Sequence, residues 1–178
     1  MEGKGGSTML TRLPFDFPGA VYRSPMPFGP FDPSRRIWEA YQEQEVDRVV
    51  VLTEKQENLT YSGGDLIGHY RENGLKVIHL PVPDHGLPPD GERFLRALGE
   101  VKEAGEAGEN TAVHCLAGIG RTGTFLACLA QLQQGLSAPE AVDWVRRFIP
   151  GAVETENQEQ FVEAFSSLVS DEAGPGQR

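Results

Sequence analysis

Short apolar runs alternate with helical periodicities over the first two thirds of the chain. Three runs are rich in β-branched residues and are bounded by polar residues or glycine, which is typical of buried parallel strands: residues 48–53, 76–82 and 111–115. Residues 21–24 are expected to form an edge strand. Between these runs, residues 34–44 and 92–103 place apolar side chains on one face of a helix, and Asp90 stands where it can cap the second helix.

After residue 120 the pattern predicts helices only. Residues 121–134 are apolar and end at Gly135, a residue type that commonly terminates helices. Ser137 and Glu140 form a capping box that opens the next helix, and Thr155 with Gln158 opens the last one. The order of elements predicts a single α/β domain over residues 13–169, with a central, mostly parallel sheet of four or five strands flanked by helices in three layers. Residues 1–12 and 170–178 are expected to be flexible termini.

Composition narrows the function classes. Of 178 residues, 39% are apolar and 24% are charged, which is ordinary for a globular protein, and the formal net charge is −10. An acidic chain is a poor candidate for nucleic-acid binding, and no run approaches the roughly 18 apolar residues of a membrane helix. The first ten residues lack the apolar region of a signal peptide, and two cysteines make no disulfide framework, so we expect a cytoplasmic protein.

The segment with clear chemistry runs from His114 to Thr124, HCLAGIGRTGT, between a predicted strand and a predicted helix. The free N–H groups at a helix N-terminus, with glycines that let the loop curl, form a cup that binds a phosphate-like anion. Arg121 can add a permanently charged, bidentate clamp. Cys115 lies at the base of the cup, where the same groups favour its thiolate, the form that attacks as a nucleophile.

Other interpretations of this segment are weaker. Residues 118–123 match the G-x-G-x-x-G dinucleotide fingerprint, but only helices follow, and that fingerprint needs a later strand with an acidic residue. The nucleotide P-loop pattern lacks its lysine before Thr124. Cys115 could also be a small core residue at a strand end. Cys128, on the helix after the loop, is expected to be a core residue. The arrangement shows no metal-ligand spacing, so no metal and no cofactor are expected.

The pattern Cys-x5-Arg-Thr-Gly resembles the signature of the cysteine-dependent protein tyrosine phosphatases, in the form of the compact dual-specificity enzymes. The similarity extends to residues 81–90 (PVPDHGLPPD), like the loop that carries the general acid in that family, and to residues 150–162. The resemblance implies the family's three-layer fold and hydrolysis of phosphotyrosine in proteins, with phosphoserine and phosphothreonine left open. It implies a phosphorylated protein or peptide as the partner. From the acidic charge and the lack of a long apolar run, neither nucleic acid nor a membrane is expected.

The same resemblance implies roles for individual residues. Cys115 attacks phosphorus, and Asp84 protonates the leaving oxygen and then activates water. Thr122 donates to the departing sulfur, Gln158 positions the water, and His114 orders the loop from beneath. The phosphoryl oxygens are bound by Arg121 and the backbone of Leu116, Ala117, Gly118, Ile119 and Gly120. Asp90 is the next-best acid, and the capping box alone explains Gln158.

Two other functions stay open. A phosphoinositide or inositol-phosphate phosphatase usually carries lysine within the signature loop, whereas residues 116–120 carry no charge. An inactive phosphopeptide-binding module would be expected to lose the cysteine, the arginine or the acid, and all three are present. Turnover of a generic aryl phosphate would separate an enzyme from a binding module.

Overall fold

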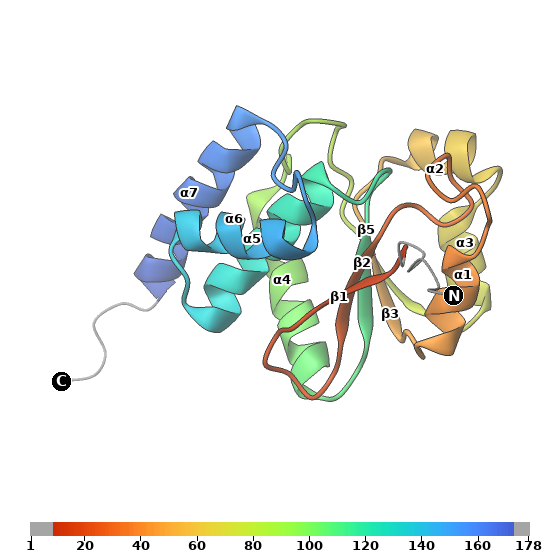
Figure 1. Ribbon diagram of the computed structural model, residues 1–178, viewed down its shortest axis with the longest axis horizontal. Helices are drawn as coiled ribbons and strands as arrows, with labels where there is room; N and C mark the ends of the chain where they lie inside the picture. Colours follow the sequence, from red (N-terminus) through yellow and green to blue (C-terminus); the bar gives the residue numbers. More distant parts are fainter. Residues whose placement is uncertain (1–8, 173–178) are drawn as a thin grey trace, which may run out of the picture.

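The structure, a computed structural model, describes residues 9–172 and has one central sheet with helices on both faces (Figure 1). The strands within this range are β1 (Thr11–Leu13), β2 (Val21–Ser24), β3 (Arg48–Val51), β4 (Lys76–His79) and β5 (Thr111–His114). The helices are α1 (Ile37–Glu43), α2 (Lys55–Ser62), α3 (Leu66–Glu72), α4 (Gly91–Glu106), α5 (Gly120–Gln134), α6 (Ala138–Phe148) and α7 (Glu156–Glu172). The predicted α/β fold is confirmed.

The strand order is β1-β2-β5-β3-β4, and every pair is parallel except β1 with β2. β5 lies in the middle of the sheet, and the candidate loop follows its carboxyl end. The loop is therefore placed at the centre of one edge of the sheet. Residues 21–24 form a strand as expected, but the edge position is wrong, since β1 pairs outside them. β1 also includes two residues of the expected flexible N-terminus, and α7 extends past residue 169. Residues 1–8 and 173–178 of the expected flexible termini lie outside the described residues.

Two apolar cores lie on opposite faces of the sheet. α4, α5, α6 and α7 cover one face and α1, α2 and α3 lie on the other (Figure 1). Side chains alternate along each strand: Val50 and Val113 belong to the core under α5, while Val49, Val51 and Ala112 belong to the core under α1 and α3. Strands buried on both faces explain the continuous apolar runs of the sequence.

Helix ends agree closely with the sequence signals. Asp90 accepts a hydrogen bond from the Arg93 N–H, and Ser137 and Glu140 make both bonds of their capping box. Gly135 ends α5 in the left-handed conformation. No helix within residues 9–172 combines the length and apolar character needed to cross a membrane.

Candidate active site

The loop between β5 and α5 is shaped by its glycines and by the end of β2. Gly118 has a φ of +75°, and a Cβ atom there would overlap the carbonyl oxygen of Ser24. Only glycine fits this left-handed position against a neighbouring backbone. The loop is therefore tightly curled at Gly118, against the end of β2.

Cys115 lies at the floor of a small pocket. Its sulfur accepts a hydrogen bond from the Gly118 N–H at 3.2 Å, and the residue is 3% exposed. The pocket has a volume of about 160 Å³ and is lined by Phe31, Asp84, His85, Cys115, Leu116, Ala117, Gly120, Arg121 and Glu154. Cys128 is buried in α5, where burial raises the pKa of its thiol well above the usual value. Of the two cysteines, Cys115 is the one that faces the pocket.

Arg121 is held in the pocket wall by several acceptors. Its two terminal nitrogens donate to the two carboxylate oxygens of Glu57 at 2.8 and 2.9 Å, and Nη1 also donates to the carbonyl of Val82 at 2.9 Å. Asp84 lies 3.3 Å from Nη2. Burial lowers the pKa of Arg121, but the hydrogen bonds with Glu57 and the charge of Cys115 outweigh it, and the net direction is upward. The guanidinium is therefore a fixed positive charge beside the sulfur.

Glu57 is a residue that sequence reasoning missed. It lies on α2, a helix whose buried residues, Asn58 and Ser62, are polar. The sequence therefore has no apolar stripe from which this helix could be predicted. The sequence signal that could have indicated the start of α2 is the capping box of Glu54 and Glu57, and both of its hydrogen bonds are present in the structure. Glu57 thus closes the first turn of α2 and pairs with Arg121.

His114 is the last residue of β5 and is fully buried beside Cys115. Its Nδ1 donates to the carbonyl oxygen of Cys115 at 2.9 Å, which leaves Nε2 to accept from the Tyr70 hydroxyl at 2.8 Å. Burial lowers the pKa of His114 to about 4, and the positive charge of Arg121 adds to this. The ring is neutral near pH 7 and connects the loop to α3 on the other face of the sheet.

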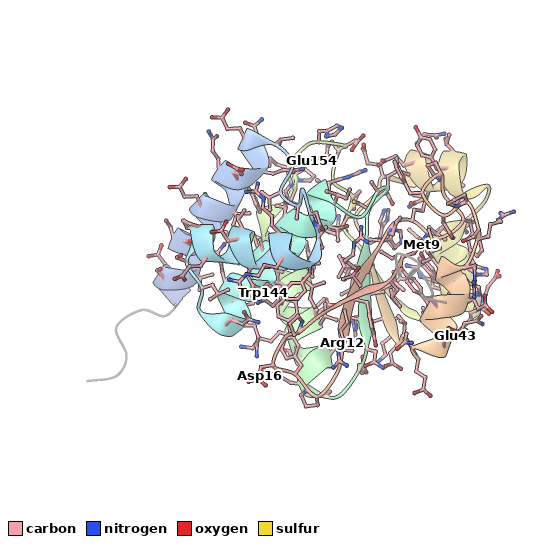
Figure 2. The ribbon with its side chains drawn as sticks, viewed as in Figure 1. Met9, Arg12, Asp16, Glu43, Trp144 and Glu154 are labelled. Atoms are coloured by element: carbon pink, nitrogen blue, oxygen red, sulfur yellow. The ribbon has the colours of Figure 1, made fainter. Side chains whose placement is uncertain are left out.

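Two carboxylates, Asp84 and Glu154, lie at the pocket rim. Asp84 is 56% exposed and accepts from the N–H of His85, a residue with a φ of +56°. His85 lies between Asp84 at 3.7 Å and Glu154 at 3.5 Å. Glu154, labelled in Figure 2, was not singled out from the sequence, because only folding brings the segment before α7 to this loop. Asp90 is absent from the pocket lining and acts as the cap of α4.

The remaining predicted residues lie beside the pocket. Thr122 is fully buried, and its hydroxyl has no hydrogen-bond partner within the part of the chain that the structure describes. Gln158 is also buried; its Oε1 accepts from the N–H groups of Glu154 and Thr155. Its amide nitrogen has no partner among the described residues. A Cβ atom on Gly120 would lie 3.2 Å from Gln158 Oε1, so this amide sits against the loop.

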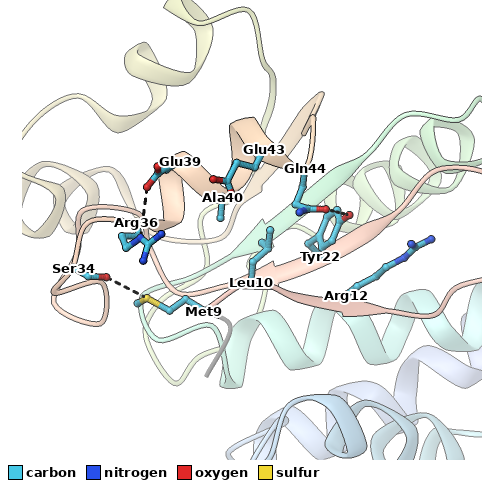
Figure 3. Close-up of a pocket in the computed structure, with 10 residues that line it drawn as sticks. All are labelled: Met9, Leu10, Arg12, Tyr22, Ser34, Arg36, Glu39, Ala40, Glu43 and Gln44. Atoms are coloured by element: carbon cyan, nitrogen blue, oxygen red, sulfur yellow. Dashed lines mark hydrogen bonds and ion pairs between the residues drawn. The ribbon is translucent and has the colours of Figure 1, made fainter. Parts of the chain in front are cut away.

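A larger pocket, of about 590 Å³, lies between β1 and α1 (Figure 3). Its lining carries both charges, Arg12 and Arg36 together with Glu39 and Glu43, and it contains no predicted site residue. Size therefore does not identify the reactive site; the nucleophile and the cation do. Among residues 9–172, no three or more His, Cys, Asp or Glu side chains gather in a way that could hold a metal ion.

A family model described as "Swiss Army Knife protein, DSP-PTPase phosphatase domain" matches residues 37–162. The chain belongs to this phosphatase-domain family. The match runs from α1 to the first half of α7 and includes every residue of the signature loop. The resemblance read from the loop is confirmed, and the family also includes Glu57 and Glu154 within its matched range.

Individual relatives agree with the family. The dual specificity protein phosphatase CDC14B of Mus musculus is 36% identical over 101 residues, which are 56% of this chain and 20% of that protein. A crystal structure of Tk-PTP in the active form is 32% identical with a TM-score of 0.73, covering 91% of this chain and 99% of that one. Kinase associated phosphatase, with its catalytic cysteine replaced by serine, has a TM-score of 0.81 at 20% identity over 94% of this chain and 98% of that one, and shows the shared fold. The chain spans between 13% and 57% of the length of the curated relatives it matches.

Proposed function

We propose that this protein hydrolyses phosphate monoesters on proteins, phosphotyrosine above all, through a cysteinyl-phosphate intermediate. The observation that carries the proposal is that Cys115 and Arg121 line one small pocket, with the Gly118 amide bonded to the sulfur. One loop then supplies the nucleophile, binds the electrophile and stabilises charge on the phosphoryl oxygens.

In the first step, the Cys115 thiolate attacks phosphorus and the bond to the tyrosine oxygen breaks. Asp84, in its protonated form, gives its proton to that oxygen. Arg121 and the N–H groups from Leu116 to Arg121 hold the three equatorial oxygens. In the second step, water attacks the phosphocysteine, Asp84 takes a proton from this water, and the sulfur leaves as a thiolate with release of inorganic phosphate.

Thr122 and Gln158 support the second step in this proposal. The unpartnered hydroxyl of Thr122 is a donor available to the departing sulfur, and burial makes a free donor there costly unless it is used. The amide nitrogen of Gln158 is also a buried donor without a partner among the described residues, and the oxygen of the hydrolytic water can serve as its acceptor. His114, neutral and bonded to the Cys115 carbonyl, keeps the base of the loop fixed.

The pocket favours a single phosphate on an aromatic leaving group. Phe31 lines it and is 51% exposed, so its ring can cover the ring of a phosphotyrosine. Arg121 is the one Lys or Arg among the lining residues of this pocket in the described chain, and Asp84 and Glu154 make the rim acidic. Substrates with several phosphates, such as phosphoinositides, would meet two carboxylates and no further cation.

We further propose a phosphorylated protein as the partner and the cytoplasm as the compartment. Both cysteines are free and buried. A thiolate nucleophile is lost on oxidation, so a reducing compartment suits this chemistry.

Two measurements test the proposal. Turnover of a phosphotyrosine peptide should be lost in Cys115→Ser, because a hydroxyl is not ionised near neutral pH, while orthovanadate or phosphate still binds. Wild-type protein that binds phosphopeptide without releasing phosphate would instead indicate a binding module.

The second measurement assigns the acid between the two rim carboxylates. A tyrosine leaving group has a pKa near 10, and a positioned acid contributes about 10²–10⁴-fold to its expulsion. Across aryl phosphates of increasing leaving-group pKa, Asp84→Asn should lose progressively more kcat, whereas Glu154→Gln should follow the wild-type slope. A steeper slope for Glu154→Gln would move the acid role to that residue.

A further inference from the structure

Arg23 reaches the phosphate-binding loop from a separate strand. It lies on β2, beside Val113 of β5, and is half-buried. Its Nε donates to the carbonyl oxygen of Gly118 at 3.0 Å, and its Nη2 donates to the carbonyl oxygen of Ala117 at 3.3 Å. One guanidinium therefore binds two consecutive carbonyls of the loop.

These contacts fix the amides as well as the carbonyls. The Ala117 C=O and the Gly118 N–H belong to one planar trans peptide group and point in opposite directions. The Gly118 N–H donates to the sulfur of Cys115. By holding the carbonyl, Arg23 therefore directs the amide that stabilises the sulfur. The second contact fixes the next peptide group, which carries the N–H of Ile119, in the same way.

The loop needs such a restraint because its centre is glycine. Gly118 has access to more backbone conformations than any other residue type, and here it takes a φ of +75°. Because glycine has no side chain, its contacts with neighbouring residues must select that conformation. The Ser24 carbonyl, packed against it, and Arg23, bonded to it, are both at the carboxyl end of β2.

Arg23 also places a charge near the sulfur. Burial lowers the pKa of Arg23, while the charges of Cys115 and Tyr41 raise it, and a guanidinium stays protonated in this balance. Arg121 shares its charge with Glu57 and Asp84, whereas the hydrogen bonds of Arg23 go to backbone carbonyls. The charged and titratable groups around Cys115 come from six segments: Arg23 on β2, Tyr41 on α1, Glu57 on α2, Asp84 and His85, His114 and Arg121, and Glu154.

We propose that Arg23 is a positioning residue for the reaction: it holds the Ala117 and Gly118 peptide groups with their amides toward the anion, and its charge favours the thiolate of Cys115. The inference rests on the proposed function, in which Cys115 is the nucleophile. It extends the site to β2, outside the segment matched by the family model.

The test compares Arg23→Met, Arg23→Lys and a matched control, Arg12→Met. Arg12 is an exposed arginine on the neighbouring strand β1, at the groove of Figure 3, so its variant makes the same charge change away from the loop. Two quantities are measured: the rate of Cys115 alkylation by iodoacetamide as a function of pH, read by mass spectrometry, and the inhibition constant of orthovanadate.

Arg23→Met should move the midpoint of the alkylation profile upward, because the nearby positive charge is lost, and should weaken orthovanadate by about tenfold or more, the effect of losing a charge-assisted bond in a poorly solvated site. Arg23→Lys should keep the midpoint near that of the wild type, because the charge remains. It should still weaken orthovanadate several-fold, because an ammonium cannot bind both carbonyls in the planar geometry of a guanidinium. Arg12→Met should match the wild type in both.

A wild type that neither binds orthovanadate nor turns over an aryl phosphate would overturn the proposed function itself. With an active wild type, Arg23→Met that keeps both the alkylation midpoint and the orthovanadate affinity would overturn only the role of Arg23, even with a lower Tm. Should Arg23→Met not fold, Arg23→Lys decides: wild-type orthovanadate affinity in that variant contradicts the need for both bonds.

Discussion

The buried histidine beneath the loop should make the protein lose stability in mild acid. His114 is fully buried and neutral, with a pKa of about 4 in the folded state. In the unfolded chain its pKa returns to about 6.5. Between these values the unfolded state binds a proton that the folded state does not, so the free energy of unfolding falls as pH decreases.

The size of the effect follows from the two values. A difference of roughly 2.5 units corresponds to about 3 kcal/mol in full, of which about 2 kcal/mol should be lost between pH 7.5 and pH 5. Well above pH 6.5 the contribution is constant, because the ring is neutral in both states. For a domain of ordinary stability, such a loss is a substantial share of the total.

Urea unfolding, followed by the fluorescence of Trp38 and Trp144 from pH 7.5 to 4.5, measures this slope. His114→Gln retains an amide that can donate to the Cys115 carbonyl, and it should remove the His114 part of the slope. His85→Gln replaces an exposed histidine, with a side chain 63% accessible, and should retain that part. A wild type with flat stability from pH 6.5 to 5, or the same slope in His114→Gln, would refute the reasoning.

Two further predictions follow from the same contacts. Glu57→Gln should lower the free energy of unfolding by about 3 kcal/mol and kcat/KM by about tenfold, because it leaves a buried guanidinium without its carboxylate. Glu54→Gln, which alters only the helix cap, should cost about 1 kcal/mol or less with kcat/KM unchanged; equal losses in urea unfolding and in kinetics for both variants would contradict the separation. Dilute peroxide should inactivate the protein reversibly and protect Cys115 from alkylation, because a thiolate open to a pocket is oxidised first. If peptide mass spectrometry finds Cys128 oxidised before Cys115, the assignment of Cys115 as the reactive thiol is wrong.

Most of the fold could be predicted because its strands and later helices are amphipathic or fully apolar. β3, β4 and β5 are recognisable from their β-branched runs, and the caps of α4 and α6 from single residues. β1, α2 and α3 were not expected. β1 has three residues. α2 buries polar side chains, and one of them, Asn58, accepts a hydrogen bond from Thr53, which precedes the helix. Such elements depend on partners elsewhere in the chain, which a local pattern does not reveal.

The site residues likewise fall into those that the sequence predicts and those that it does not. The loop from Cys115 to Arg121 is contiguous, so its chemistry could be read from spacing alone. Glu57, Glu154 and Arg23 come from three other segments, and the contacts of Arg23 with the loop span 94 and 95 positions. Each is an ordinary charged residue in the sequence. The sheet order, with β5 between β2 and β3, brings Arg23 and Glu57 to the loop, and the packing of α7 against α5 brings Glu154 there.

That arrangement also explains how a chain with a net charge of −10 can hold an anion. At physiological salt the Debye length is about 8 Å, so exposed carboxylates across the molecule are largely screened from the pocket. Inside it, the loop amides and Arg121 act at contact distance and with little screening, and Arg23 fixes two of the peptide groups. The acidic rim of Asp84 and Glu154 is close enough to act, and it opposes additional negative charge beside the phosphate. Phosphopeptides with acidic residues next to the phosphotyrosine should therefore be poorer substrates than neutral ones, a preference that kcat/KM for matched peptides would measure and that Glu154→Gln should weaken.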